Sequence, residues 1–99
     1  MKQHKMDGII EAVRYAPDGK ISLARIYERR GVVWSDHFLV SRRELVDRLQ
    51  SGKHIAVGTR DEYLGSTFQV GEHVDLLNGH IITPGESISR DRLGGVGIF

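Results

Sequence analysis

Short stretches of alternating apolar and polar residues, separated by turn residues, make up much of the chain. IIEAVRY (9–15) and ISLARIYE (21–28) are rich in the β-branched and aromatic residues that favour strands. APDGK (16–20) lies between them and has the composition of a tight turn, because proline presets φ and glycine accepts a positive φ. These two segments therefore predict a β-hairpin.

More strand-like segments follow the predicted hairpin. VVWSDHFLV (32–40) predicts a third strand, because its apolar residues largely share one parity, with Asp36 as the exception. HIAVGT, STFQV, HVDLL and HIIT, all between residues 54 and 83, predict three or four further strands. Asn78-Gly79 is a strong hairpin signal, since both residues tolerate the positive φ of a type I′ turn.

One helix is predicted at about residues 42–51. Ser41 is the expected N-cap, and Glu44 three residues later completes a capping box. Gly52 follows the helix at a position where a left-handed residue is common. The helix has a narrow apolar face that is wide enough to lie on a sheet but not to be buried all round: Leu45, Val46 and Leu49.

The predicted fold is mostly β, a β-rich α+β domain with one short helix. Many short strands favour a small barrel or a rolled antiparallel sheet, because both arrangements reduce exposed strand edges. The order of elements is compatible with an OB-like barrel, and an SH3-like barrel with an inserted helix is the rival. The predicted core takes one apolar face from each element: Ile9, Val13, Leu23, Ile26, Val33 or Trp34, Phe38, Leu45, Leu49, Ile55, Val57, Phe68, Val70, Val74, Leu76 and Ile81.

The composition indicates one ordinary globular domain. The chain has 99 residues, of which 39% are hydrophobic and 27% charged. We expect residues 1–99 to form a single domain, with tails at 1–7 and 86–99 that are flexible or become ordered on a partner. The lack of cysteine excludes disulfides and thiolate sites and fits a reducing compartment, so we expect a cytoplasmic protein. No apolar run approaches the roughly 20 residues of a membrane helix, so no membrane association is expected.

The charge distribution argues against a general polyanion-binding protein. The formal net charge is +1, although residues 40–60 carry five basic and two acidic side chains. On the predicted helix, Glu44 and Arg48 are four residues apart, as are Arg43 and Asp47. Such spacing places opposite charges side by side, so this stretch is better interpreted as a solvated salt-bridge surface than as a basic patch.

A candidate nucleic-acid-binding surface lies near the connection that follows the second predicted strand. Bases stack on aromatic rings, and arginine adds charge and cation–π contacts. The alternative is that Trp34, the one tryptophan of the chain, lies in the core. The candidate residues for binding single-stranded nucleic acid or RNA are Tyr27, Arg29, Arg30, Trp34, Lys53 and Arg60.

The sequence proposes no catalytic, metal or cofactor site. The five histidines lack HxxxH and HExxH spacing, and His73 with Asp75 would supply only two of the four ligands that zinc prefers. No G-x-S-x-G elbow is present, and GGVG (94–97) lacks the spacing of a phosphate-binding loop. We therefore expect a protein that is not an enzyme.

The C-terminal segment is apolar among glycines. Its four apolar residues either complete this domain's own core or add to the sheet edge of a partner: Leu93, Val96, Ile98 and Phe99. The leading hypothesis is a small non-catalytic interaction module that binds a protein partner or a second copy of itself, through a sheet edge or this tail. The alternative hypothesis is a single-stranded nucleic-acid-binding module.

Overall fold

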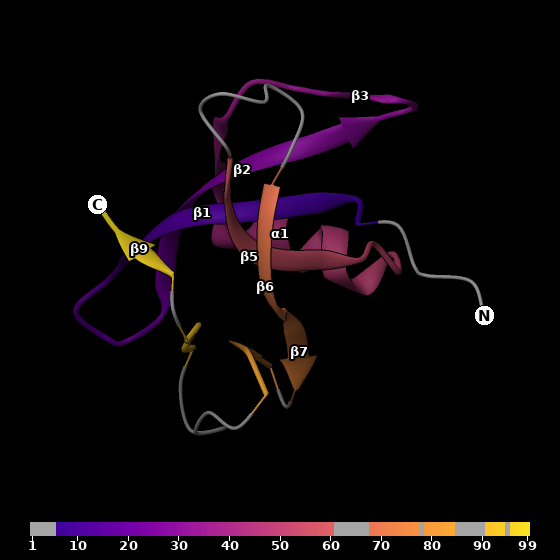
Figure 1. Cartoon of the computed structure of the whole chain (residues 1–99). Helices are drawn as coiled ribbons and strands as arrows, with labels where there is room; N and C mark the ends of the chain where they lie inside the picture. Colours follow the sequence, from indigo (N-terminus) through magenta and orange to yellow (C-terminus); the bar gives the residue numbers. More distant parts are fainter. Residues whose placement is uncertain (1–5, 61–67, 78, 85–90, 95) are drawn as a thin grey trace.

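The computed structural model describes residues 6–60, 68–77, 79–84, 91–94 and 96–99 (Figure 1). These residues form short strands and one helix, so the predicted β-rich fold is confirmed. The elements are β1 (Gly8–Tyr15), β2 (Ile21–Arg30), β3 (Val33–Trp34), β4 (Phe38–Ser41), α1 (Arg42–Gln50), β5 (Ile55–Arg60), β6 (Phe68–His73), β7 (Asp75–Leu77), β8 (His80–Ile82) and β9 (Gly97–Ile98).

Both predicted hairpins form. β1 and β2 pair in antiparallel fashion, and the turn between them has Gly19 at φ 85° with its N–H bonded to the Ala16 carbonyl at 2.9 Å. β7 and β8 also pair in antiparallel fashion, with Leu77 opposite His80 and Gly79 at φ 78°. In each case the glycine occupies the left-handed conformation that the turn requires.

The main sheet is rolled and mixed, and it is not closed into a barrel. Its strand order is β3-β2-β1-β5-β6, with β4 sharing an edge of β2 and β9 sharing an edge of β1. β1 pairs in parallel with both β5 and β9, so the expectation of a purely antiparallel sheet is wrong. Parallel neighbours need a crossover connection, and α1 lies in the connection that leads into β5. The path ends at β3 and β6, so the rolled-sheet alternative is confirmed and the closed barrel is not.

The predicted third strand is two strands. Ser35, between β3 and β4, exchanges hydrogen bonds with Glu28 of β2: the Ser35 N–H donates to the Glu28 carbonyl at 2.8 Å, and the Glu28 N–H donates to Ser35 Oγ at 3.0 Å. Both pieces still follow the outer edge of β2, where Trp34 lies opposite Arg29 and Phe38 opposite Ile26.

The helix matches its prediction closely. The Glu44 N–H donates to Ser41 Oγ and the Ser41 N–H donates to Glu44 Oε1, both at 3.1 Å, so the capping box is confirmed. α1 ends at Gln50, one residue before the predicted end, and Gly52 follows at φ 90°. Leu45 is fully buried, and the helix therefore covers one face of the sheet.

The core has two parts, one on each face of the sheet. The larger cluster lies on the side of α1: Ile10, Val13, Ile21, Ala24, Ile26, Val40, Leu45, Ile55, Val57, Val74, Ile81 and Leu93. The smaller cluster lies on the opposite face and consists of Ile9, Tyr27 and Ala56, with Met6, Trp34 and Phe68 packed against it. The rolling of the β5–β6 pair, which lies in front of β1 in Figure 1, brings Phe68 to this second cluster.

The predicted core is buried or half-buried, with one clear error. Val70 is exposed by 53%, because it belongs to a strand at the end of the sheet. Of the alternatives Val33 and Trp34, Val33 is exposed by 63% in a short projecting hairpin and Trp34 is half-buried. The remaining predicted residues split into a buried group, which is Ile9, Val13, Ile26, Leu45, Ile55, Val57, Val74 and Ile81, and a half-buried group, which is Leu23, Trp34, Phe38, Leu49, Phe68 and Leu76.

Candidate functional site

Three aromatic rings from three strands meet on the sheet face opposite α1. The centre of the Phe68 ring lies 5.1 Å from that of Tyr27 and 4.6 Å from that of Trp34. The guanidinium of Arg60 lies 5.3 Å from the Tyr27 ring centre and 5.8 Å from the Phe68 ring centre. The structure thus brings together Tyr27, Trp34 and Arg60 of the predicted set and adds Phe68, which the sequence had assigned to the core.

Tyr27 is held as a neutral, buried phenol. Burial raises the pKa of its hydroxyl, and a hydrogen bond with the Glu11 carboxylate raises it further, against the opposing charges of Arg60 and Arg25. The residue is only 6% exposed. Tyr27 therefore packs against the neighbouring rings and does not offer an open surface on which a base could stack.

The other predicted residues are distributed around this cluster. Trp34 is half-buried beside Phe68, at the base of the projecting hairpin of β2 and β3. Arg29 donates through Nε to the Gly31 carbonyl at 2.9 Å, within the same hairpin. Arg30 is largely exposed, and its Nη2 lies 3.8 Å from Glu28 Oε1.

Lys53 does not join the predicted set. It lines a small groove together with Ile26 and Ile55, whose side chains belong to the core cluster on the α1 side. Tyr27 and Ala56, the next residues along the same two strands, belong to the cluster on the opposite face. The sheet therefore separates Lys53 from the aromatic rings.

Two further arginines and one aromatic ring extend the cluster along the same face. Arg14 and Arg25 place their guanidinium carbons 4.9 and 5.2 Å from the centre of the Phe99 ring. Arg14 Nε also donates to the Phe99 carbonyl at 3.1 Å. In regular strands, the faces on which Arg14 and Arg25 lie would follow from alternation. The irregularity in β1 between Ile10 and Ala12 shifts the pairing of β1 with β2, so the sequence did not indicate that these two arginines lie together beside Phe99.

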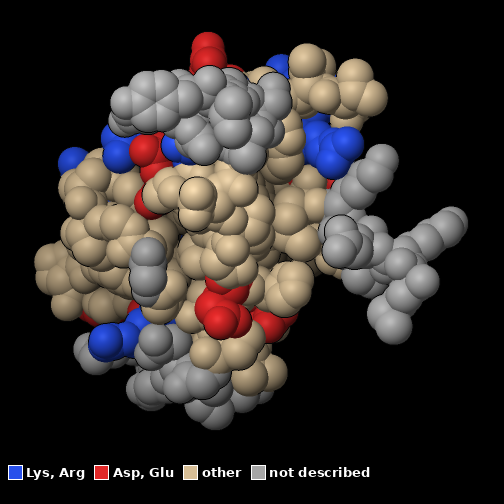
Figure 2. Space-filling model, viewed as in Figure 1, with Lys and Arg blue, Asp and Glu red and all other residues tan. Residues whose placement is uncertain are grey.

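We call this surface the arginine–aromatic face and define it by Arg14, Arg25, Arg60, Tyr27, Trp34, Phe68 and Phe99. Glu11 is the acidic residue of this face, and its Oε2 lies 3.7 Å from Arg25 Nε. This distance is too long for a hydrogen bond, and neither atom has another hydrogen-bond partner among the described residues. Asp36 Oδ1 lies 3.7 Å from Arg60 Nη1 but is fully exposed, so this ion pair contributes little. Figure 2 shows basic side chains at the upper left and upper right of this side of the molecule, with acidic side chains beside those at the upper left, around an uncharged centre.

The C-terminal residues are built into the protein's own sheet. β9 pairs in parallel with β1, and the Phe99 N–H donates to the Val13 carbonyl at 3.1 Å. Leu93 is buried in the main core and Val96 packs against it. Ile98 remains 65% exposed. A partner for this tail stays a prediction.

The outer edge of β6 is a second candidate surface. β6 pairs with β5 on one side and forms the end of the sheet in the part of the chain that the structure describes. All of its residues except Phe68 are exposed. An open groove of about 390 Å³ runs beside it, lined by Val57, Gly58, Thr59, Gln69, Val70, Gly71, Glu72 and Gly94.

Glycines let β5 and β6 approach closely along this groove. A Cβ added at Gly58 would lie 2.5 Å from the Gln69 carbonyl oxygen, and one added at Gly71 would lie 3.0 Å from Val57 Cγ2. Real Cβ atoms do not approach a backbone oxygen to 2.5 Å, so the packing of the strands requires Gly58.

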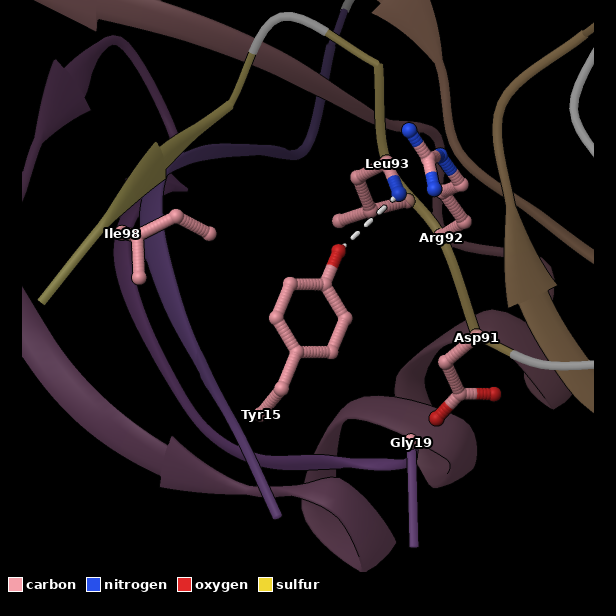
Figure 3. A pocket seen from close by; sticks show the side chains of 6 residues that line it. All are labelled: Tyr15, Gly19, Asp91, Arg92, Leu93 and Ile98. Carbon is pink, nitrogen blue, oxygen red and sulfur yellow. Dashed lines mark hydrogen bonds between the residues drawn. The ribbon is translucent and has the colours of Figure 1, made fainter. Parts of the chain in front are cut away.

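A cavity of about 340 Å³ lies between the first hairpin and the C-terminal segment (Figure 3). Tyr15, Gly19, Asp91, Arg92, Leu93 and Ile98 line it. The Tyr15 hydroxyl points toward the Leu93 N–H and accepts its hydrogen bond at 3.2 Å. Asp91 is the one buried carboxylate among the lining residues.

The carboxylate of Asp91 is fully occupied by structural hydrogen bonds. It accepts from the N–H groups of Ile21 and Ile81, both at 2.9 Å, and from Arg42 Nε at 2.7 Å and Nη2 at 3.0 Å. Burial acts to raise the pKa of Asp91, but the bonds from Arg42, Ile81 and Ile21 outweigh it and hold that pKa below its usual range. Asp91 therefore anchors the fold and does not serve as a base.

Neither a metal-ligand cluster nor a membrane-spanning helix is found in the described ranges. Within them, no three His, Cys, Asp or Glu side chains lie close enough together to hold a metal ion. The helix found there is too short to cross a bilayer.

Comparison with known proteins assigns no function, so a proposal of function depends on the arginine–aromatic face and the outer edge of β6. Neither models of protein families, nor curated proteins, nor solved structures give a match to this chain.

Proposed function

We propose that this protein is a small non-catalytic binding module that takes an extended segment of a protein partner at the outer edge of β6. The observation that supports this proposal is a six-residue strand that, among the strands the structure describes, pairs on one side only and exposes five of its residues. An edge strand of this kind carries a row of N–H and C=O groups that an added strand can satisfy.

The groove beside β6 supplies a possible source of specificity. In strand addition, main-chain hydrogen bonds provide affinity, and pockets for alternate side chains provide specificity. Val57 and Val70 are apolar residues that line the groove, and Gly71, which also lines it, has no side chain to fill it. The occupant we infer is therefore an extended peptide that places an aliphatic side chain in this groove.

A second copy of the chain is a weaker occupant. A two-fold antiparallel pairing centred on Val70 would place that half-exposed valine against its own copy and Gln69 opposite Gly71. One short strand buries less than the roughly 1,000 Å² of a stable interface, so we expect any such dimer to be transient.

Several narrower expectations are part of the same proposal. Strand addition at β6 needs no particular topology of the rest of the sheet, so it holds whether the rolled sheet is OB-like or SH3-like. Cytoplasmic residence follows from the lack of cysteine, which suits a reducing compartment. A non-catalytic role agrees with the environment of Asp91, the buried carboxylate that lines the cavity, because its oxygens already accept hydrogen bonds from within the protein.

Selection of a random phage-displayed peptide library on the purified protein tests this function. We expect selected peptides to bind the wild type, to shift backbone amide NMR signals of β5 and β6, and to lose affinity at least about tenfold with Val70→Lys, because a charged edge residue opposes strand addition. Leu77→Lys is the matched control, since Leu77 is exposed by 45% in β7. The proposal is wrong if peptides perturb other elements, if both variants weaken binding equally, or if no peptide is selected. Concentration-dependent sedimentation that Val70→Lys abolishes would instead identify a second copy as the occupant.

A further inference from the structure

We infer that the arginine–aromatic face is a binding site for single-stranded nucleic acid. This inference is independent of the proposed strand addition, because it uses the sheet face that carries Tyr27 and not the outer edge of β6. Three arginines and four aromatic rings from β1, β2, β3, β5, β6 and the C-terminal segment converge there.

The face forms one continuous strip. Arg14 and Arg25 flank Phe99 at one end. Arg25 and Tyr27 are two residues apart on β2 and so share a face, and the Arg60 guanidinium lies 5.3 Å from the Tyr27 ring centre, so the middle of the strip joins its two halves. Arg60, Phe68 and Trp34 form the other end. The hairpin arginines lie just beyond Trp34, because Arg29 is directly opposite it in the sheet.

The charges of the strip suit a phosphate backbone. The carboxylate side chains that the structure describes beside Arg25 and Arg60 are Glu11, 3.7 Å from Arg25 Nε, and the fully exposed Asp36, 3.7 Å from Arg60 Nη1. The Arg25 side chain is 33% exposed, but its Nε is buried, so a phosphate oxygen can reach only the exposed part of this side chain. The other side of the sheet differs, since Arg42 and Arg48 there are bound at short distance to Asp91 and Glu28.

The rings of the strip suit unstacked bases. Trp34, Phe68 and Phe99 are each half-buried, so each residue keeps some exposed surface while neighbouring side chains hold it in place. Base stacking on such rings tolerates any sequence, and neighbouring arginines add cation–π contacts. A duplex would keep its bases stacked away from these rings, which is why we commit to a single strand.

Fluorescence anisotropy with labelled oligo(dT) and oligo(U) of about 20 nucleotides tests this inference, since such strands offer only backbone and bases. The double variant Arg14→Gln/Arg25→Gln removes two charges from the strip. Its matched control, Arg43→Gln/Lys53→Gln, removes two charges from exposed residues elsewhere, of which Lys53 belongs to the opposite side of the sheet. We expect the first variant to lose at least about tenfold in affinity and its salt slope to fall by about 1.4, because each phosphate contact on a single strand contributes roughly 0.7. The control should stay within about twofold of the wild type.

Intrinsic fluorescence gives an independent readout, because Trp34 is the one tryptophan. Stacking of a base near it should quench its emission as anisotropy rises. If the double variant does not fold, the single variant Arg14→Gln replaces it in the binding assay, because Arg14 is exposed.

Four results would overturn the inference: no binding at about 50 mM salt, equal weakening by both double variants, binding without a change in Trp34 emission, or equal competition by polyglutamate, which carries charge without bases. A preference between oligo(dT) and oligo(U) would identify DNA or RNA as the source of the strand. Peptide binding at β6 would persist in the Arg14 and Arg25 variants, so failure here is distinguishable from failure of the proposed function.

Discussion

Replacement of Asp91 by alanine should be among the most destabilising single changes in this protein. The side chain of Asp91 is fully buried and links three distant parts of the chain: the start of β2 through Ile21, β8 through Ile81, and α1 through Arg42. The substitution leaves two backbone N–H groups and one guanidinium without their acceptor.

The magnitude follows from these lost partners. A buried donor left unpaired costs about 1–3 kcal/mol and a broken buried ion pair about 3–5 kcal/mol, and because such terms overlap we expect a loss of about 4–6 kcal/mol in the free energy of unfolding. A domain of this size has about 5–15 kcal/mol in total, so Asp91→Ala should leave a marginal fold. Asp91→Asn keeps one acceptor oxygen and should lose about 2–3 kcal/mol.

Urea unfolding followed by Trp34 fluorescence measures these losses. Asp75→Ala is the control, because Asp75 is an exposed carboxylate in β7, and it should change stability by less than about 0.5 kcal/mol. A loss below about 1 kcal/mol for Asp91→Ala would refute the reasoning, since it would mean that the buried donors find other partners.

The pH dependence of the same variants gives a second check. The pKa of Asp91 is depressed in the folded protein, so its contribution is present above the unfolded value of about 3.9 and is lost as pH falls through the lower folded value. The stability difference between wild type and Asp91→Asn should therefore be constant near neutral pH and shrink below about pH 4. A difference that grows on acidification would contradict the assigned direction.

Two further outcomes are expected. Ser41→Ala should lower the free energy of unfolding by about 1 kcal/mol in urea titrations, because it removes one half of the capping box with Glu44, and Ser41→Asp should restore most of the loss. In a spectrophotometric titration at alkaline pH, Tyr27 should ionise above the usual range of a tyrosine, because burial and the Glu11 carboxylate raise the pKa of Tyr27. The stability that depends on neutral Tyr27 is present below pH about 10 and lost as pH rises further; a Tyr27→Phe variant that still shows the late transition would contradict this assignment.

Features encoded within a few neighbouring residues were predictable. The turn around Gly19, the hairpin at Gly79 and the capping box of Ser41 all form as their residue types indicate. Each depends on a φ value or a side-chain hydrogen bond that spans no more than a few positions, so no knowledge of the rest of the chain is needed.

Features that join distant segments were not predictable. The helical arginine without a local partner, Arg42, binds Asp91 49 positions away. The parallel pairing of β1 with β5 depends on the crossover through α1. The periodicity of apolar residues indicates that a residue faces an apolar surface, but it does not indicate which segment provides that surface. For this reason the sequence predicted Val70 in the core, whereas the structure exposes it.

The candidate surfaces show the same division. Tyr27, Trp34 and Arg60 were identified from residue type, and the structure brings them together and adds Phe68 to them. The grouping of Arg14 with Phe99 depends on strand pairing. An irregularity in β1 changes which of its side chains share a face, and β9 brings the end of the chain beside β1. Residue types along the chain are sufficient to propose chemistry, but the pairing of strands places those residues together, because a shift of one residue moves a side chain to the other face.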